Sequence, residues 1–263
     1  MDTTVHLIDR GRIHADANFV LDGSTVAVAS AQNPELEYAE FLVWNLVIDH
    51  PEATVLWDTG SHHAAGDGYW PAPLFEAFAH VDADEHRLDD DLERAGYSLG
   101  DIDAVVTSHL HLDHAGGLHH FAGTDVPVYV HEEELKFAYY SAKTEEGSVA
   151  YFAPDFDHGL HWEIVHGDRQ LLPGVDLLHL PGHTPGLLGA RIEAGDDTLL
   201  VAGDEAYWRE NYENEQSMAA SLLYDNRAWF ESLQRVKELE RESGADVLCG
   251  HDLRQLEEKT RWG

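Results

Sequence analysis

Residues 107–117 read Thr-Ser-His-Leu-His-Leu-Asp-His-Ala-Gly-Gly and follow directly on the apolar run 102–106. This stretch brings three histidines and one aspartate into the six positions from His109 to His114. Neutral imidazole and ionised carboxylate are preferred ligands of zinc and similar divalent ions, and without a metal so dense a polar cluster is costly to fold. A histidine-rich surface loop is the alternative in a chain with 19 histidines. The strict H-x-H-x-D-H spacing favours a metal-binding loop at the end of a strand.

Three further candidate ligands lie downstream, each at the end of its own apolar run: His183, Asp204 and His251. Seven ligands are too many for one tetrahedral ion, and they suit two ions that share a bridging carboxylate. The predicted metal ligands are therefore His109, His111, Asp113, His114, His183, Asp204 and His251.

Taken together, these motifs resemble those of the metallo-β-lactamase superfamily. The match includes Pro-Gly-His-Thr-Pro-Gly around His183, Ala-Gly-Asp ending at Asp204 and Gly-His-Asp around His251, and it extends from about Leu42 to His251. The resemblance implies an α/β fold, a four-layer αβ/βα sandwich with two mixed β-sheets. It also implies a single domain over 1–263, built from two similar halves of about 1–125 and 126–263, with a dinuclear metal site at one edge.

The same resemblance implies which ligands bind each of the two metal ions. His109, His111 and His183 would bind one ion, Asp113, His114 and His251 would bind the second, and Asp204 would bridge both. Zinc is the expected metal, although the ligand set also accepts iron, manganese or cobalt. Asp58, in Asp-Thr-Gly, is expected to accept a hydrogen bond from a ligating histidine; capping of a turn is its alternative role.

A tyrosine three residues after the bridging aspartate narrows the substrate. Asp204-Glu-Ala-Tyr207 is similar to the corresponding segment of the N-acyl-homoserine lactonases, the quorum-quenching branch of the superfamily. In that branch a hydroxide between the two metal ions attacks the lactone carbonyl. The resemblance implies that Tyr207 donates to the carbonyl oxygen and that Asp113 carries the proton to the leaving ring oxygen. Tyr207 as a packing aromatic remains the alternative.

Other functions share this ligand set. A thioesterase of the glyoxalase II type is the nearest alternative, but that family usually adds a basic helical extension, whereas this sequence continues for twelve residues after His251. Another hydrolase of the same fold is a further alternative. From a different class, the chain could be a metal-binding or sensing protein without catalysis.

Charge is the most unusual property of the composition, with 50 acidic against 16 basic residues and a net charge of −34. Self-repulsion of this size destabilises a compact state in dilute buffer, and salt relieves it by screening. The pattern resembles cytoplasmic proteins of salt-accumulating halophiles. It also disfavours nucleic acid as a partner, because phosphate binding needs a basic surface.

The remaining features indicate a cytoplasmic protein that acts on a small molecule. No uncharged apolar run reaches about 18 residues, so no membrane span is expected. The first residues lack a basic start and an apolar signal core, and the single cysteine, Cys249, excludes an internal disulfide framework. The expected partner is a lactone, and the insertions near Ser24 and Ser61 leave room for a homodimer contact.

Along the chain, 5–18 is expected to form an opening edge strand, 24–37 a loop, and 41–49 with 54–58 a hairpin. Two irregular segments rich in aromatic residues, 61–83 and 139–158, are expected to form a pocket wall or a small satellite core. His62 and His63 are expected to lie outside the ligand set. Further strands are expected over 102–106, 126–130, 162–165, 175–180, 189–193, 198–202 and 246–249, and helices over 84–95, 131–140 and 229–242.

Overall fold

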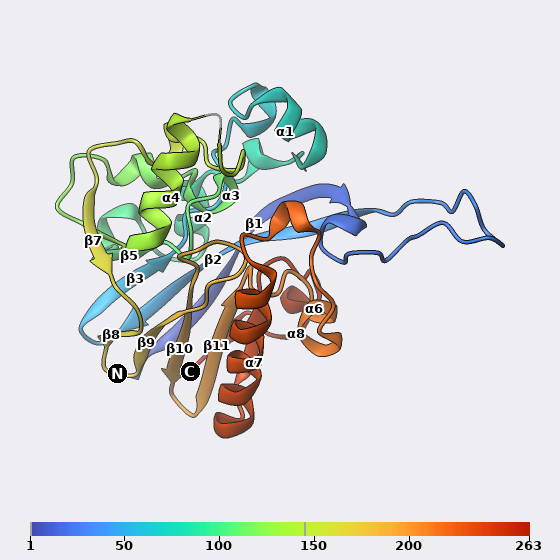
Figure 1. The fold of residues 1–263 in the computed structure, drawn as a ribbon. Coiled ribbons are helices and arrows are strands. Elements are labelled where there is room, and N and C mark those ends of the chain that lie inside the picture. Colours follow the sequence, from blue (N-terminus) through green and yellow to red (C-terminus); the bar gives the residue numbers. More distant parts are fainter. Residues whose placement is uncertain (1, 145) are drawn as a thin grey trace.

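The computed structural model describes residues 2–144 and 146–263, and two mixed β-sheets lie at its centre (Figure 1). The first sheet has the order β13-β1-β2-β3-β5-β6-β7, with β4 paired to β1. Antiparallel pairing joins β1, β2 and β3, and parallel pairing joins β3, β5, β6 and β7. Its strands are β1 (Thr4–Asp16), β2 (Tyr38–His50), β3 (Ala53–Trp57), β4 (Ala79–His80), β5 (Ala104–Val106), β6 (Pro127–His131), β7 (His161–Val165) and β13 (Arg261–Trp262).

The second sheet has the order β12-β11-β10-β9-β8. Its meander from β8 to β11 is antiparallel, and β12 adds in parallel to β11. The strands are β8 (Arg169–Leu172), β9 (Val175–His179), β10 (Leu188–Ala194), β11 (Asp197–Gly203) and β12 (Asp246–Cys249). The expected fold is confirmed: the two mixed sheets and their outer helices form the four-layer αβ/βα sandwich.

Alternating apolar residues explain why the sheets stack face to face. In β3, Val55 and Trp57 belong to the core between the sheets, whereas Leu56 points to the opposite face. In β11, Leu199 and Val201 face the first sheet, whereas Leu200 faces the outer helices. Successive side chains of a strand alternate between its faces, so a continuous apolar strand can bury both faces in a four-layer fold.

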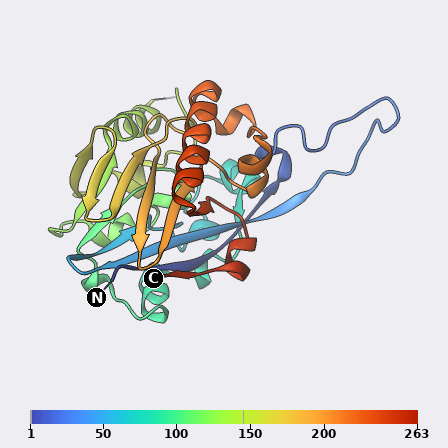
Figure 2. The same ribbon diagram turned by 90° about the horizontal axis from the view of Figure 1, so that it is seen from below.

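Helices cover the two outer faces (Figures 1 and 2). Helices α2 (Leu88–Arg94) and α4 (Glu132–Lys143) pack on the first sheet, and α7 (Asn226–Ser243) packs on the second. The stripe Trp229, Leu233 and Val236 of α7 is buried at the spacing of one helix face. The shorter helices are α1 (Ala72–Ala77), α3 (Leu112–Ala115), α5 (Ala153–Phe156), α6 (Arg209–Asn214) and α8 (Arg254–Glu258).

Three expectations from the sequence need correction in detail. The opening strand is not an edge strand, because β13 and β4 both pair with β1. The stretch 139–158 is less irregular than expected, since α4 continues to Lys143 and α5 begins at Ala153. The expected boundary near residue 126 does not coincide with a change of sheet, because β6 and β7 continue the parallel pairing of β5 and β13 returns to the first sheet.

Residues 21–37 form an extended loop that leaves the body between β1 and β2, as expected for 24–37, and we refer to it as the arm (Figures 1 and 2). Only a bridge between Val28 and Ala31 gives it pairing of its own. The side chains of Val26, Val28 and Leu36 are more than half exposed. The arm is thus an apolar projection without a covering element in the described chain.

Within residues 2–144 and 146–263, no helix has both the length and the apolar character that crossing a bilayer requires.

Candidate metal centre

The candidate ligands lie on loops that follow strand ends at one edge of the sandwich. His109, His111, Asp113 and His114 follow β5, and His183 follows β9. Asp204 follows β11, and His251 follows the neighbouring parallel strand β12. Strands from both sheets therefore deliver their ends to one place, which explains how residues up to 142 positions apart converge.

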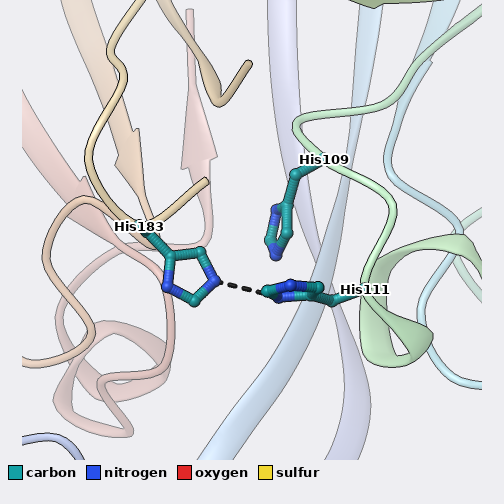
Figure 3. Close-up of side chains that lie close together, drawn as sticks. All are labelled: His109, His111 and His183. Atoms are coloured by element: carbon teal, nitrogen blue, oxygen red, sulfur yellow. Dashed lines mark hydrogen bonds between the residues drawn. The ribbon is translucent and has the colours of Figure 1, made fainter. Parts of the chain in front are cut away.

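All seven candidates meet in three overlapping groups. The groups are His109 with His111 and His183, His109 with His114 and Asp204, and Asp113 with His114 and His251. Within each group the potential ligand atoms lie within 4.8 Å of one another. Figure 3 shows the first group, in which His183 Nε2 lies 3.0 Å from His111 Nδ1.

Asp204 lies at the centre of the groups. Its Oδ2 is 3.2 Å from His251 Nε2, 3.4 Å from His114 Nε2 and 3.6 Å from His183 Nε2. Although burial opposes ionisation, the nearby His251 and His114 hold the pKa of Asp204 well below its ordinary value. An ionised, buried carboxylate among imidazoles is suited to bridge two cations.

Backbone carbonyls orient two of the imidazoles. His183 Nδ1 lies 2.6 Å from the Leu222 carbonyl, and His251 Nδ1 lies 2.7 Å from the Leu42 carbonyl. A carbonyl only accepts, so each Nδ1 carries a proton, and in the neutral imidazole Nε2 presents a lone pair. Although burial opposes the charged form, Asp204 raises the pKa of His251, and a second proton on Nε2 lets the two groups pair at 3.2 Å. A metal ion between them would take the place of that proton.

Unpartnered buried atoms point to the same conclusion. His109 Nε2, His114 Nε2 and Asp204 Oδ1 are buried and have no hydrogen-bond partner among the described residues. Burial and the neighbouring histidines keep the pKa of His109 well below its ordinary value, so its imidazole is neutral and able to coordinate. Orphaned polar atoms in a closed cluster are expensive, and the residues present therefore fit a pair of divalent cations.

Asp58 forms hydrogen bonds with the metal-binding loop, and its contact with the candidate ligand His114 was expected from the sequence. The fully buried carboxylate accepts from the Ser108 amide at 2.6 Å and the Ser108 hydroxyl at 2.7 Å, and its Oδ2 lies 3.0 Å from His114 Nδ1. Asp58 has a φ of 56°, in the left-handed region that costs energy for a non-glycine residue. In this conformation the carboxylate faces His114 Nδ1, and the contact favours the tautomer that carries its proton on Nδ1.

Two glycines let the metal-binding loop pack against the segment after β3. A Cβ at Gly116 would lie 2.1 Å from the His62 nitrogen, and a Cβ at Gly117 would lie 2.7 Å from the Thr59 carbonyl oxygen. The Gly116 amide donates to the Gly60 carbonyl at 2.8 Å. No larger residue fits at either position without moving the loop.

A cavity of about 670 Å³ opens beside the cluster. His111, Asp113, His251 and Tyr207 line one part of it. The rest is mainly apolar and comes from both aromatic segments noted in the sequence, and the wall includes Trp70, Leu74, Phe78, Tyr151 and Phe152. The aromatic segments were expected to form either a pocket wall or a small core. They contribute to both, because Trp70 lines the cavity and is also a buried core residue.

The Tyr207 ring lies near one candidate ligand from each of two ligand groups, His251 and His183. Its ring centroid is 4.5 Å from that of His251 and 5.5 Å from that of His183. Burial, reinforced by Asp204, raises the pKa of Tyr207 well above its ordinary value. The phenol therefore stays protonated and can donate a hydrogen bond into the cavity.

His62 and His63 lie outside the three groups. The ring of His62 stacks on Tyr69 at 3.7 Å and on His63 at 4.4 Å. Sequence reasoning did not find Glu134, whose buried carboxylate contacts the metal-binding loop, or the link from Ser108 to Asp58. Nothing in the local sequence distinguishes Glu134, because it is the last of three consecutive glutamates.

The fold and the cluster define a metal-dependent hydrolase class. Residues 39–251 match the family model described as the metallo-beta-lactamase superfamily, and the chain belongs to this family. It is 32% identical to the N-acyl homoserine lactonase AiiB of Agrobacterium fabrum (strain C58 / ATCC 33970), over 97% of this chain and 96% of that protein. It is 33% identical to an N-acyl homoserine lactonase of a Bacillus species, over 90% and 93% of the two chains.

Solved structures show the same likeness. An N-acyl homoserine lactone hydrolase with the product N-hexanoyl-L-homoserine bound at its catalytic metal centre superposes with a TM-score of 0.83. The two sequences are 28% identical, and the match covers 98% of this chain and 97% of that one. A variant of AiiA from B. thuringiensis with N-decanoyl-L-homoserine at the active site has the same identity and TM-score, with the same coverage of both chains.

Proposed function

We propose that this protein is a metal-dependent hydrolase that opens the lactone ring of N-acyl homoserine lactones. The observation that carries the proposal is a single cavity that joins the candidate metal ligands and Tyr207 to a long apolar wall. A lactone ring at the ligands would leave its acyl chain against that wall, since apolar surface is favourably buried there. The relatives named as lactonases over nearly the whole chain support the same substrate class.

The chemistry is a water-dependent cleavage of an ester bond. Two divalent ions, which we propose to be zinc, would be held by His109, His111, Asp113, His114, His183, Asp204 and His251 and would activate water and polarise the carbonyl. Tyr207 donates a hydrogen bond to the carbonyl oxygen as negative charge develops on it. Asp113, whose side chain is 14% exposed, would take up the proton released by the attacking water and pass it to the leaving ring oxygen. Water is added across the C–O bond, and the product is an open hydroxy acid.

A substrate panel tests this proposal. Purified protein, loaded with zinc and assayed in molar KCl, is expected to hydrolyse acyl homoserine lactones with a higher kcat/KM than simple lactones, thioesters or phosphodiesters. Preference for a thioester would favour the glyoxalase II type. A fully metal-loaded protein that turns over none of these substrates would favour a binding or sensing role.

Tyr207→Phe is expected to lower kcat/KM for a lactone by roughly 30- to 150-fold, because removal of one oxyanion donor costs about 2–3 kcal/mol. Metal content should not change, since the metal-ligand groups do not include the phenol. Tyr212→Phe is the matched control, because Tyr212 is equally buried but donates to Glu240 away from the cavity. Equal activity of the wild type and Tyr207→Phe would leave Tyr207 a packing residue.

We further propose a cytoplasmic protein of a salt-rich cell that takes neither nucleic acid nor membrane as a partner. The net charge of −34 supports each part of this proposal. We also propose that residues 1–263 fold as one domain. The pairing of β13 with β1 supports this, since it joins the end of the chain to the sheet of its first strand.

The arm supports a homodimer as the assembled form. Its residues 23–34 carry no charge, which is unusual in so acidic a chain, and its apolar side chains are exposed. A neutral apolar segment can dock on an acidic copy without electrostatic repulsion. Sedimentation velocity in molar KCl is expected to give a dimer for the full chain and a monomer when 25–35 is replaced by a short glycine linker. A monomeric full chain would contradict the dimer.

A further inference from the structure

Glu134, in the first turn of α4, lies against the metal-binding loop although it is not a candidate ligand. Its side chain is completely buried, and Oε1 accepts from the Leu110 amide at 2.9 Å. Leu110 is the residue between His109 and His111. A hydrogen bond at this amide holds the backbone from which both imidazoles project.

The same residue contacts the loop that carries His183. A Cβ at Gly186 would lie 2.3 Å from the Glu134 nitrogen and 2.5 Å from its Cβ, so the two backbones pack without a gap. The first turn of α4 therefore joins a loop of the first sheet to a loop of the second.

A third contact reaches His111 from the cavity side. The Tyr151 hydroxyl donates to Glu134 Oε1 at 2.8 Å, and the Tyr151 ring lies 4.6 Å from the His111 ring between centroids. The Glu134 carboxylate thus fixes an aromatic ring that closes one side of His111. Among the described residues, no lysine or arginine pairs with Glu134, so its interactions are with these loops and with Tyr151.

The second group of ligands has separate support. His114 is held by Asp58, and His251 by the Leu42 carbonyl. Neither contact involves α4. The ligands thus differ in their supports. Glu134 holds the backbone between His109 and His111 and packs on the His183 loop. Asp58 contacts His114 directly and His109 through Ser108, whose hydroxyl donates to Asp58 and lies 3.0 Å from His109 Nδ1.

We propose that Glu134 is a positioning residue for the cation site formed by His109, His111 and His183 and that its effect is confined to this site, whereas Asp58 contributes to both sites through His114 and through Ser108 and His109. The inference rests on the proposed function only in that the reaction uses this metal centre. Partners that orient metal ligands typically change metal affinity by about 10- to 100-fold when replaced.

Metal titration tests this inference without any substrate. Metal-free protein is titrated with Co²⁺ against a chromophoric chelator in molar KCl, and the two stepwise affinities and the d–d spectra are recorded. His183→Ala and His251→Ala supply the reference spectra for loss of one site or the other. Glu134→Gln is expected to weaken one step by about 10- to 100-fold and to give a one-equivalent spectrum like that of His183→Ala. Asp58→Asn should weaken both steps, because Asp58 contacts His114 directly and His109 through Ser108.

Glu133→Gln is the matched control, because Glu133 is the preceding residue but is exposed and pairs with Lys136. It should leave both affinities unchanged. Gly186→Ala should reproduce the effect of Glu134→Gln, since it forces the His183 loop away from α4. If Glu134→Gln does not fold, Tyr151→Phe and Gly186→Ala carry the same test.

Equal weakening of both steps in Glu134→Gln would show general destabilisation and overturn the inference, as would unchanged affinities. Because Co²⁺ binding is measured directly, a wild type that binds two ions but opens no lactone would refute the proposed function alone. Selective loss of one site would still support the role of Glu134.

Discussion

Asp204→Asn is expected to lose tight binding of the second metal equivalent and to lower lactone hydrolysis by about 10³-fold or more. The carboxylate lies within 3.7 Å of four imidazole nitrogens, from His109, His114, His183 and His251. Asparagine keeps the shape but removes the charge that offsets repulsion between two cations. Metal ions contribute several kcal/mol to such reactions, and each 1.36 kcal/mol corresponds to a tenfold change in rate.

The measurements are metal content after gel filtration and kcat/KM on an acyl homoserine lactone. Asp91→Asn is the matched control, since Asp91 is a buried aspartate that pairs with Arg10 at 3.2 Å away from the centre. That variant should be less stable but should retain both ions. An Asp204→Asn protein with two tightly bound ions and wild-type activity would exclude a bridging role.

Transfer from molar KCl to dilute buffer is the second change with a large expected effect. The net charge of −34 is spread over a chain of 263 residues, and most of the ion pairs in the described residues lie at the surface, where each contributes little. The Debye length is about 10 Å at 0.1 M salt and 3 Å at 1 M. We expect the melting temperature to fall by roughly 10 °C or more in dilute buffer. At this chain size, a loss of 1 kcal/mol in the free energy of unfolding lowers the melting temperature by about 2–4 °C. Activity should fall as the folded fraction falls.

The dependence on concentration separates screening from other effects of salt. Screening predicts that most of the recovery occurs below about 1 M KCl. Sucrose at matched osmolality is the control, because it favours the compact state through exclusion and screens no charge. A melting temperature and activity that are the same in dilute buffer and in molar KCl would refute adaptation to salt.

The sequence was most informative where one residue type had to recur at a strict spacing. His109, His111, Asp113 and His114 are recognisable because their chemistry is concentrated in six positions. Their partner His183 could be assigned because a strand precedes it and the resemblance covers its motif. The same is true of the strands, since continuous apolar runs such as β11 are expected of strands buried on both faces.

Short elements and the boundaries between the sheets were harder to predict from the sequence. The two-residue β13 forms only because β1 offers it an open edge, and no local pattern marks Arg261 and Trp262 as a strand. The division between the sheets depends on which neighbour β6 and β7 pair with. Strand pairing is a non-local choice, and local propensity does not encode it.

By itself, the sequence determined the class of chemistry, because ligand identity and spacing are local properties of the chain. Only the tertiary structure decided which groups support those ligands. Glu134 is one of three consecutive glutamates and differs from Glu133 solely in where the helix points it. Its burial against Leu110 and Gly186 arises from the packing of α4 on two loops of different sheets, which is a property of the folded chain and not of any segment within it.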